Sequence, residues 1–226
     1  MTSRNLVKLF KNTLLVGGVT TIIVGLFVHW NELQPFFVDF KIIDIISAII
    51  WLMVMGFLFS VISQMGFFAY LTIHRFGLGI FKSASLWNAV QIVLILFGLF
   101  DLVYLRYTNF AKTGDSILPY LVPALLLLVV GLAVAWVKSK ETNREAFIPA
   151  VFFMIVVTLL EWVPVLRENA ENWFYLMAFA LMACNAYQIL ILHKLNAQSE
   201  QERQQRLKQK EGKTINNKKM NKKPSI

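Results

Sequence analysis

The chain has 226 residues, of which 57% are hydrophobic and 15% are charged, and it carries a formal net charge of +9 and one cysteine, Cys184. A soluble domain is about half apolar and a quarter charged, so this composition excludes an ordinary soluble domain and indicates a membrane protein. A single cysteine also excludes an internal disulfide and any metal site built from several thiolates.

Six apolar segments are long enough to cross a bilayer. A helix needs about 20 apolar residues to span a hydrocarbon core roughly 30 Å thick. Polar, glycine-containing or proline-containing stretches, among them residues 31–35, separate these segments. The sequence therefore predicts an all-α fold, a polytopic bundle of six transmembrane helices in a multi-pass protein of the cell membrane. The predicted spans are residues 12–30, 42–70, 87–104, 117–137, 147–165 and 173–192.

The first span follows a basic lead, as in a secretory signal peptide. Polar residues 29–32 come after it without a small-residue cleavage site, so we expect a retained helix. Gly17, Thr21 and Gly25 place a small residue at every fourth position of this helix. Such a row lets helix backbones approach closely in lipid, and it predicts a packing face either inside the bundle or between protomers.

The second span is too long to cross the bilayer upright. Residues 42–70 would form a helix of roughly 43 Å, so we expect it to tilt or to extend beyond the hydrocarbon. Residues 64–83 then lead into the third span, and we interpret Gly77 and Gly79 as breakers in a short basic turn. The turn either couples to a partner or only reverses the chain and fixes its orientation. Its candidate coupling residues are Gln64, His74, Arg75, Gly77, Gly79 and Lys82.

Basic residues are distributed unevenly between the two sides. With the N-terminus inside, 18 of the 22 Lys and Arg residues lie on the inner side, and the outer side holds Lys41, Arg106, Lys112 and Arg167. Because cytoplasmic connections are enriched in Lys and Arg, and six spans return the chain to its starting side, both termini are predicted to be cytoplasmic.

The last part of the chain differs in composition from the rest. We expect residues 1–195 to form the six-span bundle and residues 196–226 to form a basic cytoplasmic tail, because ten Lys and Arg residues follow His193. The tail is expected to be helical up to about Gly212 and disordered beyond it. It either anchors the topology or attracts anionic lipid.

Five amide side chains near the inner ends of three spans define a first polar layer. Gln64 lies late in the second span, Asn88 and Gln91 lie early in the third, and Asn185 and Gln188 lie late in the sixth. Each pair is three residues apart and so shares a helix face. The layer either forms interhelical hydrogen bonds or binds something small.

Two carboxyl groups, Asp101 and Glu161, define a second polar layer nearer the outside. A carboxylate at this depth must meet a cation, reach water or take up a proton. Arg106 and Arg167 follow them in sequence. The layer is either a ligand or proton site in an outward cavity or a set of local pairs at the interface.

The sequence contains no catalytic constellation. It has no HExxH, GxSxG, P-loop or dinucleotide-binding motif. Its three histidines lie at span ends, with His29 outside and His74 and His193 inside, so they cannot form one metal site. We therefore predict a protein that is not an enzyme, has no cofactor or metal, binds no nucleic acid and has the lipid bilayer as a partner.

Two adjoining stretches are similar to a known family. They read SVISQMGFFAYLTIHRFGLGIFKS, residues 60–83, and SLWNAVQIVLILFGLFDLVYLRY, residues 85–107, and the opening SRNLVKLF and TLLVGG fit the same family. Over residues 1–195 the chain resembles the KinB-signalling pathway activation proteins, KbaA, of spore-forming bacilli. The Lys- and Asn-rich tail has no counterpart in this resemblance.

The resemblance implies an integral membrane protein that promotes signalling through the sensor histidine kinase KinB, which feeds the sporulation phosphorelay. It carries over no catalytic residues. It favours residues 64–83 as a coupling surface, with a helix contact through Gly17, Thr21 and Gly25 as another route to the kinase. The alternative function is a small-solute transporter or channel subunit that uses Asp101 and Glu161, although the spans show no internal repeat.

Overall fold

The structure is a computed structural model that describes residues 2–166 and 171–220, and every regular element in these ranges is helical. The predicted all-α fold is confirmed for this part of the chain. In chain order the elements are α1 (Ser3–Val28), α2 (Trp30–Val38), α3 (Ile42–Phe81), α4 (Ala84–Phe110), α5 (Leu118–Glu141), the 3-10 turn η1 (Arg144–Ala146), α6 (Phe147–Phe152), the π-helical turn η2 (Phe153–Val157), α7 (Thr158–Leu166) and α8 (Glu171–Met220).

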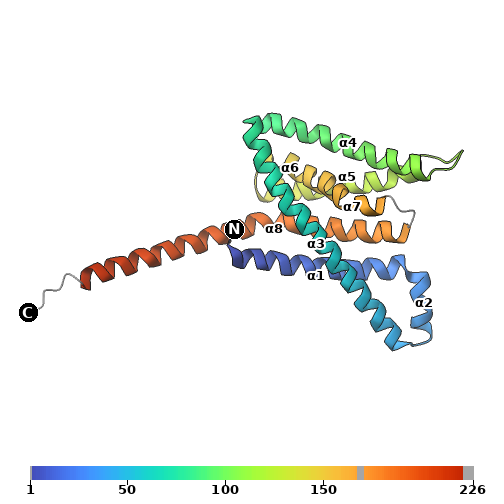
Figure 1. Ribbon diagram of the computed structural model, residues 1–226, viewed down its shortest axis with the longest axis horizontal. Coiled ribbons are helices and arrows are strands. Elements are labelled where there is room, and N and C mark those ends of the chain that lie inside the picture. Colours follow the sequence, from blue (N-terminus) through green and yellow to red (C-terminus); the bar gives the residue numbers. More distant parts are fainter. Residues whose placement is uncertain (1, 167–170, 221–226) are drawn as a thin grey trace, which may run out of the picture.

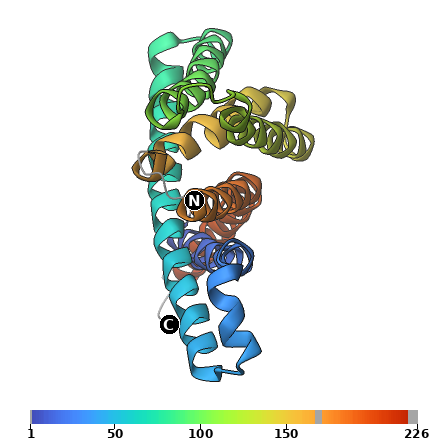
Figure 2. The same cartoon turned by 90° about the vertical axis from the view of Figure 1, so that its right-hand side faces the viewer.

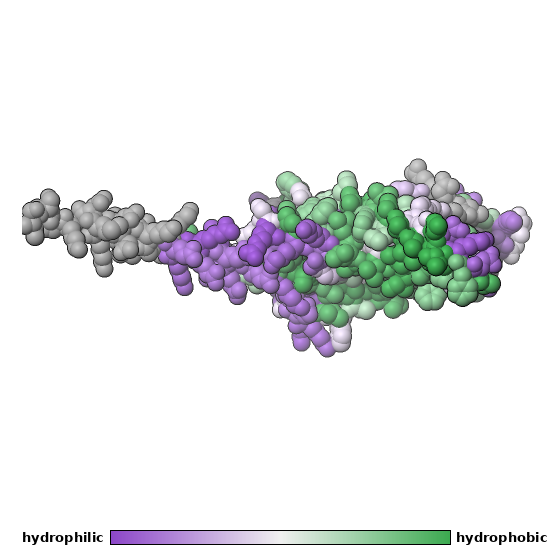
Figure 3. Space-filling model, turned by 90° about the horizontal axis from the view of Figure 1, so that it is seen from below, coloured by the Kyte–Doolittle hydropathy of each residue, from purple (hydrophilic) through white to green (hydrophobic). Residues whose placement is uncertain are grey.

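Six helical segments of the described chain are long and apolar enough to cross a membrane, which confirms the predicted number. The outer surface of the bundle is also apolar, as expected for helices that contact lipid. Figure 3 shows an apolar belt on the visible face of the bundle, with polar residues at the projecting part of α8 and at the opposite end. Large side chains such as Phe27, Ile43 and Ile80 are more than 70% exposed. These features are compatible with a multi-pass membrane protein whose exposed faces contact lipid.

Helix α3 runs obliquely across the other long helices, against α1 and α8 along one part and against α4 and α7 along another (Figures 1 and 2). Its 40 residues correspond to a length of about 60 Å. That is about twice the thickness of a bilayer core, so a helix of this length either tilts steeply in a membrane or extends beyond the hydrocarbon, as predicted for this segment. The helix ends at Phe81 rather than at residue 70.

The predicted break at Gly77 and Gly79 is wrong. Both glycines lie inside α3, and the reversal consists only of Lys82, which has a positive φ of 50°, and Ser83, the N-cap of α4. Gly77 is needed for close packing, because a Cβ there would lie 2.5 Å from the indole of Trp87. Helix continuity also keeps the backbone hydrogen bonds satisfied in an apolar environment.

Residues 31–35, predicted to be a polar connection, form most of the short helix α2 instead. The backbone N–H groups of Glu32 and Leu33 both donate to the carbonyl of His29, which starts this helix directly after α1 ends. Pro35 lies inside it, in a helix of only nine residues. The helix folds the chain back from α1 toward the beginning of α3 (Figure 1).

The fifth span is irregular where the sequence predicted one continuous helix. It consists of η1, α6, the π-helical turn η2 and α7. A π-helical turn adds one residue to the helical ladder, so the face presented by the following residues rotates by about 100°. In Figure 2, α4, α5 and the bundle part of α8 are seen close to end-on, whereas α6 and α7 cross the view at an angle.

Helix α8 continues without a break from the bundle to Met220, past Gly212. Its first turns outside the bundle pack against α1, since the N–H of Thr2 and the amide of Asn5 both donate to Ser199 Oγ, at 3.0 and 2.9 Å. The stretch beyond Gly212 contains Thr214, Asn216 and Asn217, which are weak helix formers, so helix propensity does not explain why the helix is longer than predicted. The rest of the predicted disordered tail, residues 221–226, lies outside the described residues.

The bundle therefore has two distinct ends. We call the end with the N-terminus and the departing part of α8 the α8 end, and the opposite end, with α2, the α2 end (Figure 1). The even number of spans returns the chain to its starting end, as predicted. Residues 203–220 are called the α8 extension.

Candidate functional site

A hydrogen-bonded polar network lies in the interior of the bundle between α3, α7 and α8. Asn185 of α8 is its centre, accepting from Ser63 Oγ at 2.7 Å and placing its amide Nδ2 2.9 Å from Thr158 Oγ1 and 2.7 Å from Glu161 Oε2. Gln188, one turn further along α8, donates to Ser63. All five side chains are buried. We call these residues the polar network.

Local helix geometry explains why these side chains meet. Asn185 and Gln188 share one face of α8, as their spacing predicted. Thr158 and Glu161 are also three residues apart, and they belong to the first turn of α7, directly after the π-helical turn η2. The rotation introduced by that turn orients the α7 face, so this irregular segment positions two of the five network residues.

Glu161 has one satisfied and one unsatisfied carboxyl oxygen. Oε2 accepts from Asn185, whereas Oε1 is buried without a hydrogen-bond partner. The carboxyl group packs against α3 at Gly66, where a Cβ would overlap Oε1 and would lie 2.8 Å from the carboxyl carbon. Position 66 therefore accommodates the acid only because it has no side chain.

The predicted separation into two polar layers is wrong for Asn185 and Glu161. Their positions along the fifth and sixth predicted spans place these two residues on opposite sides of the membrane centre if both spans are upright. Because α6 and α7 are inclined to α8 (Figure 2), the two side chains come within hydrogen-bonding distance. The network therefore joins one member of each predicted layer.

The other predicted polar residues lie elsewhere. Gln64 and Gln91 are buried, and neither side chain has a hydrogen-bond partner. Asp101 is half-buried on α4. The Arg106 guanidinium lies 4.0 Å from the centre of the Phe174 ring, a cation–π contact. Arg167, the predicted neighbour of Glu161, is outside the described residues.

A cavity of about 760 Å³ at the α8 end brings together Asn88 of α4 and His74 of α3. The indole N–H of Trp87 donates to His74 Nδ1 at 3.1 Å. Lys138 of α5 also lines this cavity, and it is only 6% exposed, with its ammonium nitrogen 3.3 Å from His193 Nδ1. Sequence reasoning missed this buried lysine, because it was counted only as a basic residue after a span.

The predicted coupling residues divide into two groups. Gln64 and Gly77 are buried, and His74 is half-buried against Trp87. Arg75, Gly79 and Lys82 are exposed at the C-terminal end of α3. Their spacing of four and three residues places them on one side of the helix.

The predicted packing face on α1 is internal. A Cβ at Gly17 would lie 2.8 Å from the Gly56 carbonyl oxygen of α3 and 2.9 Å from Cys184 Sγ of α8, and Gly25 faces Leu52. Thr21 is buried and lies next to Gly56. The face therefore packs α1 onto its own bundle and is not a free route to a partner.

Small polar residues complete these contacts, and sequence reasoning missed them. Ser60 Oγ donates to the carbonyl of Thr13 at 3.0 Å, and Ser63 joins the polar network. Together with Gly56 they recur every three or four residues along α3, which is the same signal that identified the α1 face. No group of three or more His, Cys, Asp or Glu side chains in residues 2–166 and 171–220 could hold a metal ion.

These features define the class of protein: the described residues form helices, six helical segments are long and apolar enough to cross a membrane, and the interior holds a network of mutually bonded polar side chains. Residues 17–195 match the family model of KbaA, described as KinB-signalling pathway activation in sporulation. The KinB-signaling pathway activation protein of Bacillus subtilis (strain 168) is 46% identical over 197 residues, which cover 87% of this chain and 100% of that relative. The chain belongs to the KbaA family. No solved structure matches it.

The contact between Gly66 and Glu161 leads to a first prediction. Gly66→Ala is expected to displace the carboxyl group and to destabilise the protein by about 1–2 kcal/mol, because the buried bond to Asn185 is lost. The measurement is the unfolding midpoint of the purified protein during titration of mixed micelles with dodecyl sulfate.

A double-mutant cycle supplies the control for Gly66→Ala. In a Glu161→Ala background the added methyl group meets no carboxyl group, so its cost should disappear and the two substitutions should be strongly non-additive. Equal costs in both backgrounds would contradict the contact.

Proposed function

We propose that the protein is an integral protein of the cell membrane that promotes activation of a membrane sensor histidine kinase of the KinB type, upstream of the sporulation phosphorelay, without being an enzyme. Membership of the KbaA family is the observation that carries this proposal. The six apolar spans and the apolar belt of Figure 3 support the membrane location.

The proposed orientation places the α8 end in the cytoplasm. The connections at that end carry basic residues, and the opposite connections carry few, which is the asymmetry that the positive-inside rule describes. The basic residues at the α8 end, apart from those that follow His193, are Arg4, Lys8, Lys11, Arg75, Lys82, Lys138, Lys140 and Arg144.

The proposed kinase contact is the exposed side of the C-terminal end of α3. Arg75, Gly79 and Lys82 lie there, next to Phe76 and Ile80, which are 67% and 72% exposed. Two positive charges beside large apolar side chains suit a partner that is itself embedded at the inner surface of the membrane. We call Arg75, Gly79 and Lys82 the α3 face.

The α8 extension is proposed to be dispensable for this activity. The family match ends at residue 195, and 197 residues of this chain cover the full length of the Bacillus subtilis relative. Activation that is shared with that relative should therefore reside in the bundle. The contacts of Ser199 and Glu202 with the first turn of α1 belong to the bundle and should be retained in a truncated chain.

The surroundings of Asp101 and Glu161 do not favour the transporter alternative. Both residues lie outside the cavity that contains His74 and Lys138, and both lie outside the cavity at the α2 end. Glu161 is instead bonded within the polar network. These surroundings favour signalling over transport as the function of the protein.

A complementation experiment tests the proposed kinase activation, the role of the α3 face and the dispensability of the α8 extension. In a Bacillus subtilis strain that lacks the relative and depends on KinB for sporulation, expression of this chain should restore a transcriptional reporter of phosphorelay output. Truncation after Glu202 should leave the restored output within about twofold. Arg75→Glu combined with Lys82→Glu should lower it at least fivefold, because both contact charges are reversed.

The matched control reverses two exposed charges at the α2 end, Lys41→Glu with Lys112→Glu, and should leave the output unchanged. Protein levels are compared by immunoblotting. Failure of the unaltered chain to restore output would count against the proposed function. Loss of output in the control as well as in the α3 face variant would remove the α3 face from the proposal.

A further inference from the structure

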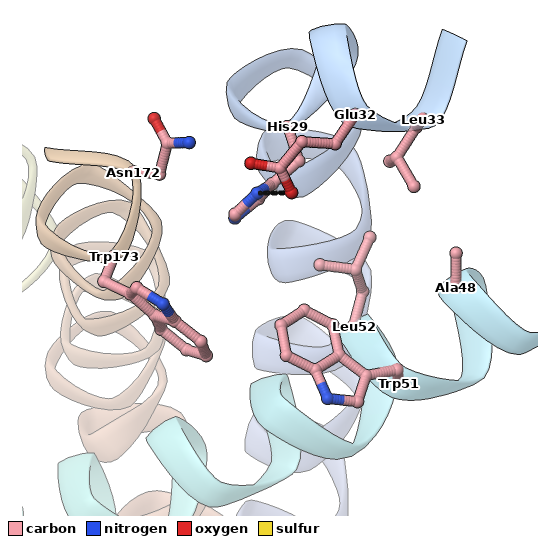
Figure 4. Close-up of a pocket in the computed structure, with 8 residues that line it drawn as sticks. All are labelled: His29, Glu32, Leu33, Ala48, Trp51, Leu52, Asn172 and Trp173. Carbon is pink, nitrogen blue, oxygen red and sulfur yellow. Dashed lines mark hydrogen bonds and ion pairs between the residues drawn. The ribbon is translucent and has the colours of Figure 1, made fainter. Parts of the chain in front are cut away.

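A cavity of about 580 Å³ opens at the α2 end of the bundle, away from both the polar network and the α3 face. It lies between the α1–α2 corner, α3 and the start of α8, and the last of these segments is far from the other two in sequence (Figure 4). Its volume is typical of small-molecule sites. The lining residues are His29, Glu32, Leu33, Ala48, Trp51, Leu52, Asn172 and Trp173.

Three aromatic rings gather at this cavity. The rings of Trp51 and Trp173 contact each other edge to face with centres 5.5 Å apart, and the His29 ring lies 6.4 Å and 6.5 Å from them. The faces of indole rings carry negative potential and attract organic cations. The aromatic wall therefore favours a positively charged ligand with an apolar part.

The polar groups of the cavity favour the same charge. His29 Nδ1 lies 3.1 Å from Glu32 Oε2. In the neutral tautomer that has its proton on Nδ1, this nitrogen donates to the carboxylate. The second ring nitrogen, Nε2, is then an acceptor, and it is buried without a hydrogen-bond partner. A buried acceptor without a donor is costly, so the site is completed by a ligand that supplies an N–H group.

The Glu32 carboxylate adds the charge of the site. Its side chain is 67% exposed, so the carboxylate lies at the open side of the cavity, whereas the His29 side chain that it contacts is 11% exposed. Figure 4 shows this contact as a dashed line. A carboxylate at the entrance attracts cations and repels anions. The ring faces, the unsatisfied acceptor and the carboxylate thus all favour a cation that has an N–H group and an apolar part.

We propose that this cavity binds an organic ammonium ion with a small apolar body. The ammonium group donates to His29 Nε2, the Glu32 carboxylate on the other ring nitrogen attracts it over a longer distance, and the apolar body packs on Trp51 and Trp173. The group can come from a free amine or from the headgroup of phosphatidylethanolamine. The site is independent of the proposed signalling function and stands or falls separately from it.

Calorimetric titration of the full chain in nanodiscs of phosphatidylglycerol tests the ligand class. The probes are phenethylammonium, benzyltrimethylammonium, 2-phenylethanol and 3-phenylpropionate, which share an aromatic body and differ in the polar group. Phenethylammonium should bind at least tenfold more tightly than the alcohol and more tightly than the quaternary ion, which has no N–H group. The carboxylate should bind most weakly.

Matched variants locate the site. Glu32→Gln and Trp51→Leu should each weaken phenethylammonium binding at least fivefold. Asp44→Asn and Trp30→Leu are controls at the same end, since neither residue lines the cavity and Trp30 instead stacks on Phe37. Both controls should stay within twofold of the unaltered protein. Because Glu32 is well exposed, Glu32→Gln decides the matter if the tryptophan variant fails to fold.

A second arm identifies the source of the ammonium group. Replacing half of the phosphatidylglycerol by phosphatidylethanolamine should weaken phenethylammonium binding by competition if the site takes a lipid headgroup, and should leave it unchanged if the site takes free amines. Equal affinities for all four probes, no binding of either ammonium ion at 10 mM, or equal losses in the lining and control variants would each overturn the proposal.

Discussion

Replacing Gly56 by leucine is expected to separate α1 from α3 and to destabilise the protein by at least about 3 kcal/mol, the upper range for overpacking. A Cβ at this position would lie 2.5 Å from the carbonyl oxygen of Gly17 and 2.7 Å from the Cα of Gly18. Both atoms belong to the α1 backbone, so no side-chain rotation can relieve the overlap. The two helices must move apart, and the contacts of Thr21 and Ser60 along the same crossing are lost with them.

Gly79→Leu is the matched control, because it introduces the same side chain into the same helix. Nothing lies within 4 Å of a Cβ at Gly79, and leucine is a better helix former than glycine by about 1 kcal/mol. We expect an unchanged or slightly raised unfolding midpoint in mixed micelles titrated with dodecyl sulfate. If Gly56→Leu unfolded at the same midpoint as Gly79→Leu, the close α1–α3 crossing would be wrong.

The α1–α3 crossing also shows which parts of helix packing can be predicted from sequence patterns. The spacing of Gly17, Thr21 and Gly25 correctly indicates a packing face, since close approach in lipid requires small residues at every fourth position. It cannot identify the opposing helix. That information lies in the complementary small residues Gly56 and Ser60, which become meaningful only when the two helices are placed together.

Hydropathy predicts which segments span the membrane but not how they are inclined. The number of spans and the shared end of the termini follow from composition and parity. The bond between Glu161 and Asn185 does not, because it depends on the inclination of α6 and α7 and on the π-helical turn η2. Gly77 was misread for a similar reason, since its role is visible only against the indole of Trp87.

Replacing Asn185 by alanine is expected to disrupt the polar network in the interior of the bundle. The side chain makes hydrogen bonds to Ser63, Thr158 and Glu161, each from a different position on the neighbouring helices. Interhelical hydrogen bonds in membranes contribute about 0.6 kcal/mol each, with a maximum near 1.7. Three lost bonds, together with a buried carboxyl group left without a partner, should cost about 3 kcal/mol.

Asn109→Ala is the control for this substitution, since Asn109 is exposed near the end of α4. It should change stability by less than about 0.5 kcal/mol, as is usual for surface positions. Dodecyl sulfate titration measures both variants, and a Glu161→Gln variant shows whether the carboxyl group contributes more than an amide of the same shape. An Asn185→Ala protein as stable as the Asn109→Ala protein would mean that Asn185 does not hold α3, α7 and α8 together.

The position of Asn185 connects this stability effect to signalling. It lies on the unbroken helix that leaves the bundle at the α8 end, where Ser199 contacts the first turn of α1. A loosened network should therefore allow α8 to shift at the end where the kinase contact is proposed. At matched protein levels, Asn185→Ala should lower phosphorelay output at least fivefold, whereas truncation after Glu202 should not. Unchanged output from a destabilised Asn185→Ala protein would separate the polar network from the activity and leave it a purely structural element.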